Sequence, residues 1–251
     1  MPGVTDRSRP SGADSDLSVF PYPISMAFQP IVNAADHSVY GYEALVRGGR
    51  GESAPSILTL VNEANKYDFD QACRVTAIRQ ATHLGLNARL HINFLPNAVF
   101  STPAHIQRTL DTAQACGMPC TSITFEIVEG ELIEDIPRVQ DMFAQYAALG
   151  FLTALDDFGK GYSGLSLLSE IQPDIVKLDM NLIKGIDGDR VRQSIVRGFA
   201  SVCDELNILI IAEGVETVDE SLRLLEHGIP FQQGYLFARP GFEALPLPVF
   251  P

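Results

Sequence analysis

From Ile24 onward, short apolar runs alternate along the chain with amphipathic helical patterns, and this alternation limits the folds open to the sequence. Most of the runs are continuous, predominantly apolar and rich in β-branched residues, which is typical of strands buried on both faces of a parallel sheet. The strands predicted in this way are Met26–Val32, Val39–Val46, Leu90–Phe94, Ser122–Ile127, Phe151–Leu155, Ile175–Leu178, Ile208–Ala212 and Phe231–Leu236.

The segments between the predicted strands have the apolar spacing of helices that pack against a sheet. The stripes are Val191, Ile195, Phe199, Val202 and Leu206 in one helix, and Val139, Met142, Phe143, Tyr146 and Leu149 in another. Asp135 is expected to cap the second helix, and Thr217 with Glu220 forms a capping box at the start of a third. We expect both stripes to face the core.

Eight strands with helices between most of them predict an α/β fold, a TIM-like (β/α)8 barrel, and 251 residues is a usual length for one such barrel. The short turn at residues 34–37 joins the first two strands as a hairpin, so one strand near the N-terminus is expected to run antiparallel to the rest. Residues 1–19 are rich in Ser, Asp, Gly and Pro and are predicted to be a disordered tail. Residues 20–251 are predicted to form one domain.

The net charge of −13 argues against binding of a nucleic-acid polymer, because such binding needs a basic surface for the phosphates. No apolar stretch approaches the ~20 residues that span a bilayer, and the N-terminus lacks the basic and apolar regions of a signal peptide. The four cysteines form no C-x-x-C pair, so free thiols in a reducing cytoplasm are favoured over a zinc site. The sequence therefore predicts a cytoplasmic protein that does not insert into membranes.

Two adjacent carboxylates, Asp156 and Asp157, follow the apolar run Phe151–Leu155, and three glycines come within the next seven residues. Adjacent acids repel each other in a partly dry pocket, and a divalent cation with oxygen ligands removes that repulsion. For this pair alone, a solvated turn is the alternative, because Asp and Gly are common in turns.

Polar residues also lie within or just after the other predicted strands, and we expect them at the end of the barrel where such folds carry their active sites. They are Glu43, Asn93, Glu126 with Glu129, Lys177 with Asp179, Glu213 with Glu216, and Gln233. One such residue is usually a satisfied structural group, but a ring of carboxylates at one mouth needs more positive charge than one lysine supplies. Two divalent metals would balance that charge and are the usual device for phosphodiester hydrolysis.

These strand-end residues lie in motifs that resemble those of the EAL-domain family of bacterial cyclic di-GMP phosphodiesterases. The resemblance runs from about Met26 to Glu243. In chain order the motifs are Phe28-Gln-Pro-Ile-Val32, Glu43-Ala-Leu-Val-Arg47, Asn93, Phe125-Glu-Ile-Val-Glu129, Asp156-Asp-Phe-Gly-Lys-Gly-Tyr-Ser163, Lys177-Leu-Asp179, Ala212-Glu-Gly-Val-Glu-Thr217 and Gln233-Gly-Tyr-Leu-Phe237. One tripeptide is weak evidence, whereas this whole series in this order is specific. By this resemblance, residues 20–251 are an EAL phosphodiesterase domain.

The resemblance implies metal-dependent hydrolysis of cyclic di-GMP to linear pGpG, with two Mg²⁺ or Mn²⁺ ions in each active site. The implied metal ligands are Glu43, Asn93, Glu126, Asp156 and Asp157, with Asp156 as the bridge between the ions. Glu213 is implied as the general base, and Lys177 as the group that orients the attacking water or neutralises developing charge. The implied substrate contacts are Gln29, Leu45, Arg47, Asp179 and Gln233.

The resemblance also implies supporting roles. Glu129 looks like the anchor of the glycine-rich loop after Asp157, which the family associates with dimerisation, so a homodimer is expected. Glu216 looks like a supporting residue behind the metal ligands. Lys160 departs from the small residue or Thr that is usual between the loop glycines, and residues 48–53 are more glycine-rich than in the commoner family version. Neither departure removes a catalytic group.

An alternative from another functional class is a catalytically inactive EAL domain that serves as a cyclic di-GMP receptor or a protein-interaction module. Inactive members usually lack metal ligands or the loop anchor, and this chain keeps all of them. A barrel enzyme that acts on another phosphoester is a third interpretation. The sequence contains no evident sensor pattern, which leaves open a regulatory domain or partner outside it.

Overall fold

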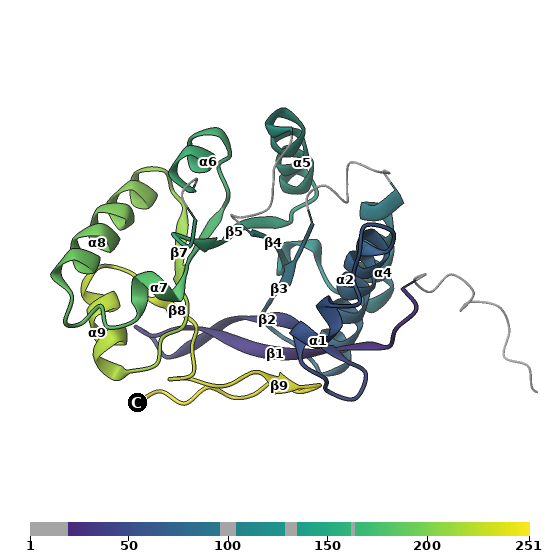
Figure 1. Ribbon diagram of the computed structural model, residues 1–251, viewed down its shortest axis with the longest axis horizontal. Coiled ribbons are helices and arrows are strands. Elements are labelled where there is room, and N and C mark those ends of the chain that lie inside the picture. Colours follow the sequence, from purple (N-terminus) through teal and green to yellow (C-terminus); the bar gives the residue numbers. More distant parts are fainter. Residues whose placement is uncertain (1–19, 96–103, 129–134, 162–163) are drawn as a thin grey trace, which may run out of the picture.

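The structure, a computed structural model, describes residues 20–95, 104–128, 135–161 and 164–251. Eight strands close into a barrel, and helices on its outside connect most of them (Figure 1). The predicted TIM-like (β/α)8 barrel is therefore confirmed. The tail predicted at residues 1–19 lies outside the described residues, and so does Glu129.

Seven strands of the barrel run parallel to one another in chain order. They are β2 (Ser38–Gly48), β3 (Arg89–Asn93), β4 (Ile123–Val128), β5 (Leu152–Phe158), β6 (Ile175–Leu178), β7 (Leu209–Ala212) and β8 (Phe231–Gln232). The eighth strand, β1 (Ile24–Asn33), is antiparallel to both β2 and β8 and closes the ring. The antiparallel strand predicted near the N-terminus is thus confirmed.

A further short strand, β9 (Gly241–Phe242), pairs with β1 and was not predicted. Two residues are too few to carry a recognisable strand pattern. Glu243 fixes the chain beside it: its N–H donates to the Met26 carbonyl at 2.9 Å, and its Oε1 accepts from the Ser25 hydroxyl at 2.6 Å. Contacts between segments far apart in the sequence therefore hold this strand in place, and no local pattern predicts them.

The last barrel strand, β8, is shorter than the predicted strand Phe231–Leu236, because the chain leaves the sheet at Gly234. A Cβ atom at Gly234 would lie 2.0 Å from the carbonyl oxygen of Val215, so only glycine allows the two backbones to approach this closely. Just before this point, the N–H of Gln233 still donates to the Ala212 carbonyl at 2.8 Å. The early turn leaves the Gln233 side chain lining the barrel mouth.

Eight α-helices lie in the described part of the chain. They are α1 (Ala54–Leu58), α2 (Lys66–His83), α4 (Ala104–Cys116), α5 (Ile136–Ala148), α6 (Gly164–Glu170), α7 (Met180–Ile183), α8 (Arg190–Glu205) and α9 (Val218–Glu226). Asp135 accepts from the Arg138 N–H at the start of α5, and Thr217 with Glu220 forms the capping box of α9, so both predicted caps are confirmed. Among these helices, none has both the length and the apolar character needed to cross a bilayer.

The prediction that the apolar stripe of α8 faces the core is wrong for four of its five residues. The residues that are exposed instead are Val191, Ile195, Val202 and Leu206. The buried residues of α8 are Val196, Phe199 and Cys203, on the neighbouring side of the helix. The Phe199 ring stacks on Phe158 of β5 at a centroid distance of 4.3 Å, and this contact is part of what sets the rotation of the helix. On α5 the prediction is correct for Val139, Met142 and Tyr146, which are buried. Leu149, directly after the helix, is exposed.

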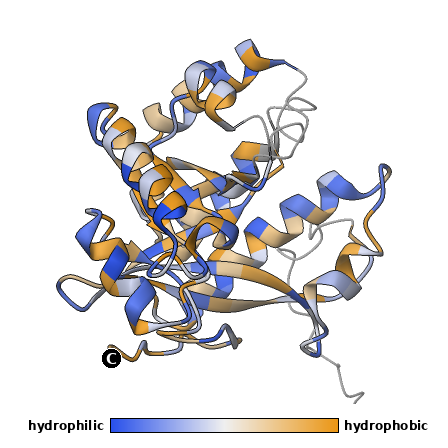
Figure 2. Cartoon of the chain, turned by 60° about the vertical axis from the view of Figure 1, so that its left-hand side comes forward, coloured by the Kyte–Doolittle hydropathy of each residue, from blue (hydrophilic) through white to orange (hydrophobic). Residues whose placement is uncertain are grey.

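Inside the barrel, apolar and charged side chains form two successive layers. The apolar layer consists of Ile31, Ala154, Ile175 and Ile211. Each lies two residues from a polar residue, and side chains two apart share one face of a strand. In the same order, these polar residues are Gln29, Asp156, Lys177 and Glu213. Strand alternation therefore places the polar side chains on top of an apolar layer. In Figure 2, much of the barrel strands has the orange of hydrophobic residues.

Candidate active site

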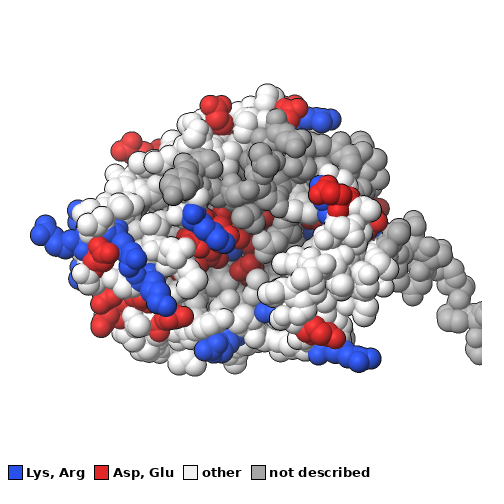
Figure 3. Space-filling model, viewed as in Figure 1, with Lys and Arg blue, Asp and Glu red and all other residues white. Residues whose placement is uncertain are grey.

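Charged side chains from five strands meet at the barrel mouth, where Figure 3 shows acidic residues gathered in a central hollow. We call the buried or nearly buried members of this group the carboxylate floor: Glu43, Glu126, Asp156, Lys177 and Glu213. The residues come from β2, β4, β5, β6 and the end of β7. They meet because the C-terminal ends of parallel barrel strands all open at one mouth.

The single cation of the floor, Lys177, has a side chain with 0% exposure. Its Nζ lies 2.8 Å from Glu213 Oε1, 2.9 Å from Glu126 Oε2, 3.1 Å from Asp156 Oδ1 and 3.4 Å from Glu43 Oε2. Burial by itself lowers the pKa of Lys177, but the surrounding carboxylates, Asp156 and Glu126 first, raise it well above its usual value. Lys177 is therefore a permanent positive charge at the centre of the floor.

One ammonium does not neutralise four carboxylates, and the pKa values of the acids reflect this. Burial raises the pKa of Glu126 to about 7, although Lys177 opposes the change. Burial followed by the charge of Asp156 raises the pKa of Glu213 well above its usual value. The pKa of Asp156 is also raised, again by burial first. Without another cation, these buried carboxylates therefore bind protons at a higher pH than exposed carboxylates do.

Two overlapping groups of carboxylates have the spacing of cation sites. Oxygens of Glu43, Glu126 and Asp156 lie within 4.8 Å of one another, and so do oxygens of Asp156, Asp157 and Glu213. Asp156 belongs to both groups, and its buried Oδ1 lies 3.1 Å from Lys177 Nζ without the geometry of a hydrogen bond. Carboxylate oxygens suit hard divalent cations such as Mg²⁺, Mn²⁺ and Ca²⁺. The donor set therefore fits two such ions that share Asp156.

A distortion of β5 brings both adjacent acids to the mouth. Successive strand residues normally point to opposite faces of a sheet. The register of β5 against β6 shifts between Leu155 and Phe158, and Asp157 has a φ of 57°, which is unusual for a residue other than glycine. As a result Asp157 also lines the cavity, with its Oδ2 2.8 Å from Lys160 Nζ. The alternation of the sequence alone does not predict this arrangement.

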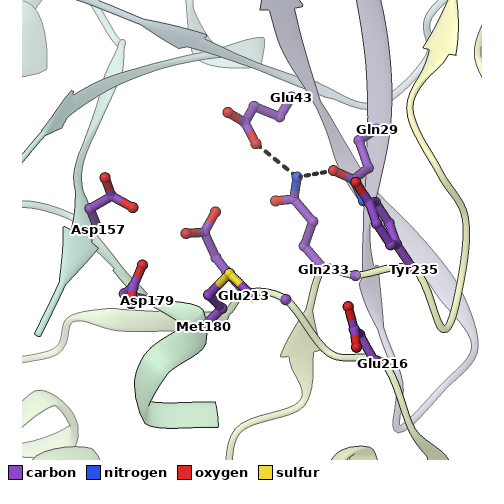
Figure 4. Close-up of a pocket in the computed structure, with 11 residues that line it drawn as sticks. Gln29, Glu43, Asp157, Asp179, Met180, Glu213, Glu216, Gln233 and Tyr235 are labelled. Carbon is purple, nitrogen blue, oxygen red and sulfur yellow. Dashed lines mark hydrogen bonds between the residues drawn. The ribbon is translucent and has the colours of Figure 1, made fainter. Parts of the chain in front are cut away.

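Above the floor is an acidic cavity of about 260 Å³, shown in Figure 4. Gln233 lies on one side of it, where its Nε2 donates to Glu43 Oε2 at 2.7 Å and to Gln29 Oε1 at 3.2 Å. Gln29 in turn donates to the Ala238 carbonyl at 3.1 Å. This chain of amide hydrogen bonds holds Oε2 of Glu43 in place, while Oε1 accepts from Asn93.

Asp179 and Glu216, two further residues predicted from the sequence, also line the acidic cavity. Asp179 caps α7, where its Oδ1 accepts from the N–H of Asn181 at 2.9 Å. Glu216 is held through its backbone N–H, which donates to Glu220 Oε2 at 2.9 Å. Glu220 also accepts from the N–H of Gly185, so one buried carboxylate ties the two loops together.

Three residues predicted as ligands or substrate contacts, Leu45, Arg47 and Asn93, are not among the described residues that line the acidic cavity. Asn93 donates to Glu43 Oε1 at 3.1 Å, which brings its amide to the edge of the floor. Leu45 and Asn93 line a second, mostly apolar cavity of about 440 Å³ between β2, β3 and the helices α1 and α2. Arg47 donates to the carbonyl of its neighbour Val46 at 2.7 Å, and the described residues around the acidic cavity do not include it.

The structure places three further residues at the site. From the sequence, His91 is interpreted only as a core histidine or one behind the metal ligands, and Met180 and Tyr235 have no role of their own. His91, with 0% exposure, lies 2.8 Å through Nδ1 from Glu126 Oε1. Met180 and Tyr235 line the acidic cavity. Each lies near a predicted residue: Met180 directly after Asp179, Tyr235 two after Gln233, and His91 two before Asn93. Their position next to a motif was the available signal.

Comparison with known protein families matches residues 23–240 to the EAL domain. The blue light- and temperature-regulated antirepressor BluF of Escherichia coli K12 is 30% identical over 228 residues, which are 90% of this chain and 56% of BluF. The cyclic di-GMP phosphodiesterase PdeR of the same organism is 36% identical over 161 residues, which are 62% of this chain and 23% of PdeR. The chain thus spans about half or less of the length of these relatives.

Two solved structures resemble this barrel closely. A standalone versatile EAL protein from Vibrio cholerae O395, in its c-di-GMP bound form, has 48% sequence identity and a TM-score of 0.88, and the match covers 92% of this chain and 97% of that protein. BlrP1 of Klebsiella pneumoniae, in a calcium and cyclic di-GMP complex, has 34% identity and a TM-score of 0.84, covering 89% of this chain and 57% of BlrP1. On these matches, together with the barrel and its mouth, the chain belongs to the EAL domain family.

Proposed function

We propose that the protein is a metal-dependent phosphodiesterase that hydrolyses one phosphodiester bond of cyclic di-GMP and releases linear pGpG. The observation that carries this proposal is the carboxylate floor, in which Asp156 is common to two cation-sized groups of oxygens beside a buried lysine. The names of PdeR and of the c-di-GMP bound Vibrio cholerae protein support the choice of substrate.

The metal ligands in this proposal are Glu43, Asn93, Glu126, Asp156 and Asp157, and Mg²⁺ or Mn²⁺ are the expected ions. Two such cations would supply an activated water and neutralise the negative charge that develops on the phosphate oxygens. A manganese complex of BlrP1 with cyclic di-GMP supports the choice of metal. The Asn93 amide reaches the floor through its hydrogen bond to Glu43, consistent with a neutral ligand at the edge of the group.

The remaining side chains bind and orient. Glu213, which lines the cavity and pairs with Lys177, is the general base that accepts a proton from the attacking water. Lys177 holds the carboxylates in place and offers positive charge next to the reacting phosphate. Substrate contacts are assigned to Gln29, Leu45, Arg47, Asp179 and Gln233, and supporting roles to Glu216 and Glu129. The apolar cavity beside Leu45 is of the kind that accepts the flat face of a base.

The test is turnover of cyclic di-GMP by the purified protein, with the product separated by chromatography. With Mn²⁺ or Mg²⁺ we expect pGpG as the first product, and excess EDTA should stop its formation. Glu43→Ala and Asp156→Asn should lower kcat by at least about 1000-fold, because each removes an oxygen ligand from the floor. Asp189→Asn is a matched control, since this carboxylate caps α8 and pairs with Arg192 but is not among the described residues that line the acidic cavity, and it should keep full activity.

The alternative class, an inactive EAL domain that acts as a receptor, makes a different prediction in the same assay. Binding of cyclic di-GMP with no turnover under either metal would contradict the proposed enzyme. If the protein neither binds nor hydrolyses cyclic di-GMP, the choice of substrate is contradicted. The homodimer and the cytoplasmic location expected from the sequence stay predictions, which sedimentation analysis and cell fractionation can check.

A further inference from the structure

His91 occupies the middle of β3, within the barrel and next to the carboxylate floor. Its side chain has 0% exposure, and in the sheet it is level with Glu43 on β2 and Thr124 on β4. The Tyr40 ring, which packs against the apolar layer, lies 5.8 Å from the imidazole by ring centroids. A polar ring in such surroundings is costly unless it is hydrogen-bonded. The position of His91 therefore needs an explanation.

The neighbouring strand β2 leaves room for this imidazole at Gly41. A Cβ atom on Gly41 would lie 3.2 Å from Cδ2 of His91 and 2.6 Å from the carbonyl oxygen of Arg89. Gly41 does not have a positive φ, so its backbone conformation alone does not require glycine. What the position requires is the absence of a side chain. A side chain at this position would meet the backbone of Arg89 first and the imidazole of His91 next.

The hydrogen bond of His91 is made to Glu126, whose two oxygens have different partners. Nδ1 of His91 lies 2.8 Å from Oε1, while Oε2 accepts from Lys177 Nζ at 2.9 Å. Lys177 also pairs with three other carboxylates, so its ammonium alone does not set the direction of the Glu126 carboxylate. With Glu126 ionised, the hydrogen of a neutral His91 must be on Nδ1. Its Nε2 has no hydrogen-bond partner among the described residues.

We infer that His91 is a positioning residue for the metal site: its Nδ1–H holds one oxygen of Glu126 and so directs the other oxygen toward Lys177 and the cation. This inference rests on the proposed function, because it requires Glu126 to be a metal ligand. Hydrogen-bond partners behind metal ligands typically change metal affinity or activity by about 10–100-fold when they are removed. A histidine that only filled the core would change stability and leave metal affinity as it is.

Two substitutions separate orientation from packing. His91→Gln keeps an amide N–H that can reach Glu126, whereas His91→Leu fills a similar space without a donor. The probe is Mn²⁺ alone, without nucleotide and at fixed pH, with the free ion followed by electron paramagnetic resonance. We expect H91L to weaken the tighter Mn²⁺ site about 10-fold and H91Q to stay within about three-fold of the wild type. Thr124→Val removes a buried hydroxyl level with His91 and should bind Mn²⁺ as the wild type does.

Unchanged Mn²⁺ affinity in H91L, or equal losses in H91L and H91Q, would overturn the inference. A wild-type protein that binds no Mn²⁺ would instead contradict the proposed function. If H91L does not fold, nitrogen-15 NMR of histidine-labelled wild type decides the question, with H91Q identifying the His91 signals among those of the five histidines. A hydrogen on Nδ1 supports the inference, and a hydrogen on Nε2 overturns it.

Discussion

Two lysines at the barrel mouth stand in opposite settings. Lys177 in the carboxylate floor has 0% exposure and lies within 3.4 Å of four carboxylates. Lys160 is 60% exposed, and its ion pair is with Asp157 at 2.8 Å. We call Asp157, Lys160 and Glu216 the rim. The floor and the rim thus carry the same chemical groups, but the floor is dry and the rim is wet.

This difference sets how strongly the protein itself holds each region. An exposed ion pair stabilises a protein by about 0–1 kcal/mol, whereas breaking a buried pair costs about 3–5 kcal/mol. The fold therefore fixes the arrangement of the floor, and substituting one of its members should disturb the positions of the others and lower the stability of the protein. The arrangement of the rim depends on what binds there, so its members should affect binding without affecting the fold.

The largest effect is expected for Lys177→Met. The substitution leaves four buried carboxylates without their cation, so the metal-free free energy of unfolding should fall by about 3–5 kcal/mol at pH 8, and kcat by at least about 1000-fold. Urea unfolding and turnover measure the two quantities. Lys66→Met is the matched control, because it removes an ion pair of 2.6 Å with the exposed Glu63. Equal stability losses in both variants would contradict the distinction between a buried and an exposed ion pair.

The pH dependence of stability is the next test of the floor. Burial raises the pKa of Glu126 from 4.5 to about 7, so between these values the folded metal-free protein binds more protons than the unfolded chain. This stabilisation is complete below about pH 4.5 and is lost as the pH rises through about 7, with a total of at most about 3 kcal/mol. Urea unfolding in EDTA across this range should show the loss, and Glu126→Gln should reduce it. A contribution of Glu126 that increases with pH would contradict this account.

A smaller and different effect is expected for Asp157→Asn in the rim. The side chain is partly exposed, so the free energy of unfolding should change by less than about 1 kcal/mol. Loss of one ligand of the second cation should lower kcat by about 100-fold and reduce the Mn²⁺ bound in calorimetry from two ions to one. Loss of both ions would mean that the rim is as tightly coupled as the floor.

The smallest effect is expected for Lys160→Met. In the metal-free protein Lys160 neutralises Asp157, so its removal should tighten the weaker Mn²⁺ site by about two- to five-fold while stability stays within about 0.5 kcal/mol. Because the pair is exposed, 0.5 M salt should abolish most of the difference. Weaker Mn²⁺ binding in this variant would instead assign Lys160 a supporting role at the mouth.

The sequence predicted the barrel and most of the floor for one topological reason. Residues that follow parallel strands must meet at one mouth, so Glu126, Asp156 and Glu213 could be grouped without knowing any distance. The antiparallel first strand followed from a short turn, which a parallel connection does not allow.

The parts that were not predicted depend on contacts between distant segments. The position of Asp157 comes from a distortion of β5, and the rotation of α8 from the fit of Phe199 against Phe158. The hydrogen bond of His91 joins β3 to Glu126 on β4, and no pattern within β3 reveals this partner. Periodicity along the chain carries no information on any of these contacts.

The central claim is that two cations share Asp156, one held by the floor and one reaching the rim. Anomalous diffraction from crystals grown with Mn²⁺ tests it most directly, because the peaks locate the ions without reference to activity. We predict two peaks, one among Glu43, Glu126 and Asp156 and one among Asp156, Asp157 and Glu213. A single peak, or peaks that do not contact Asp156, would contradict the account.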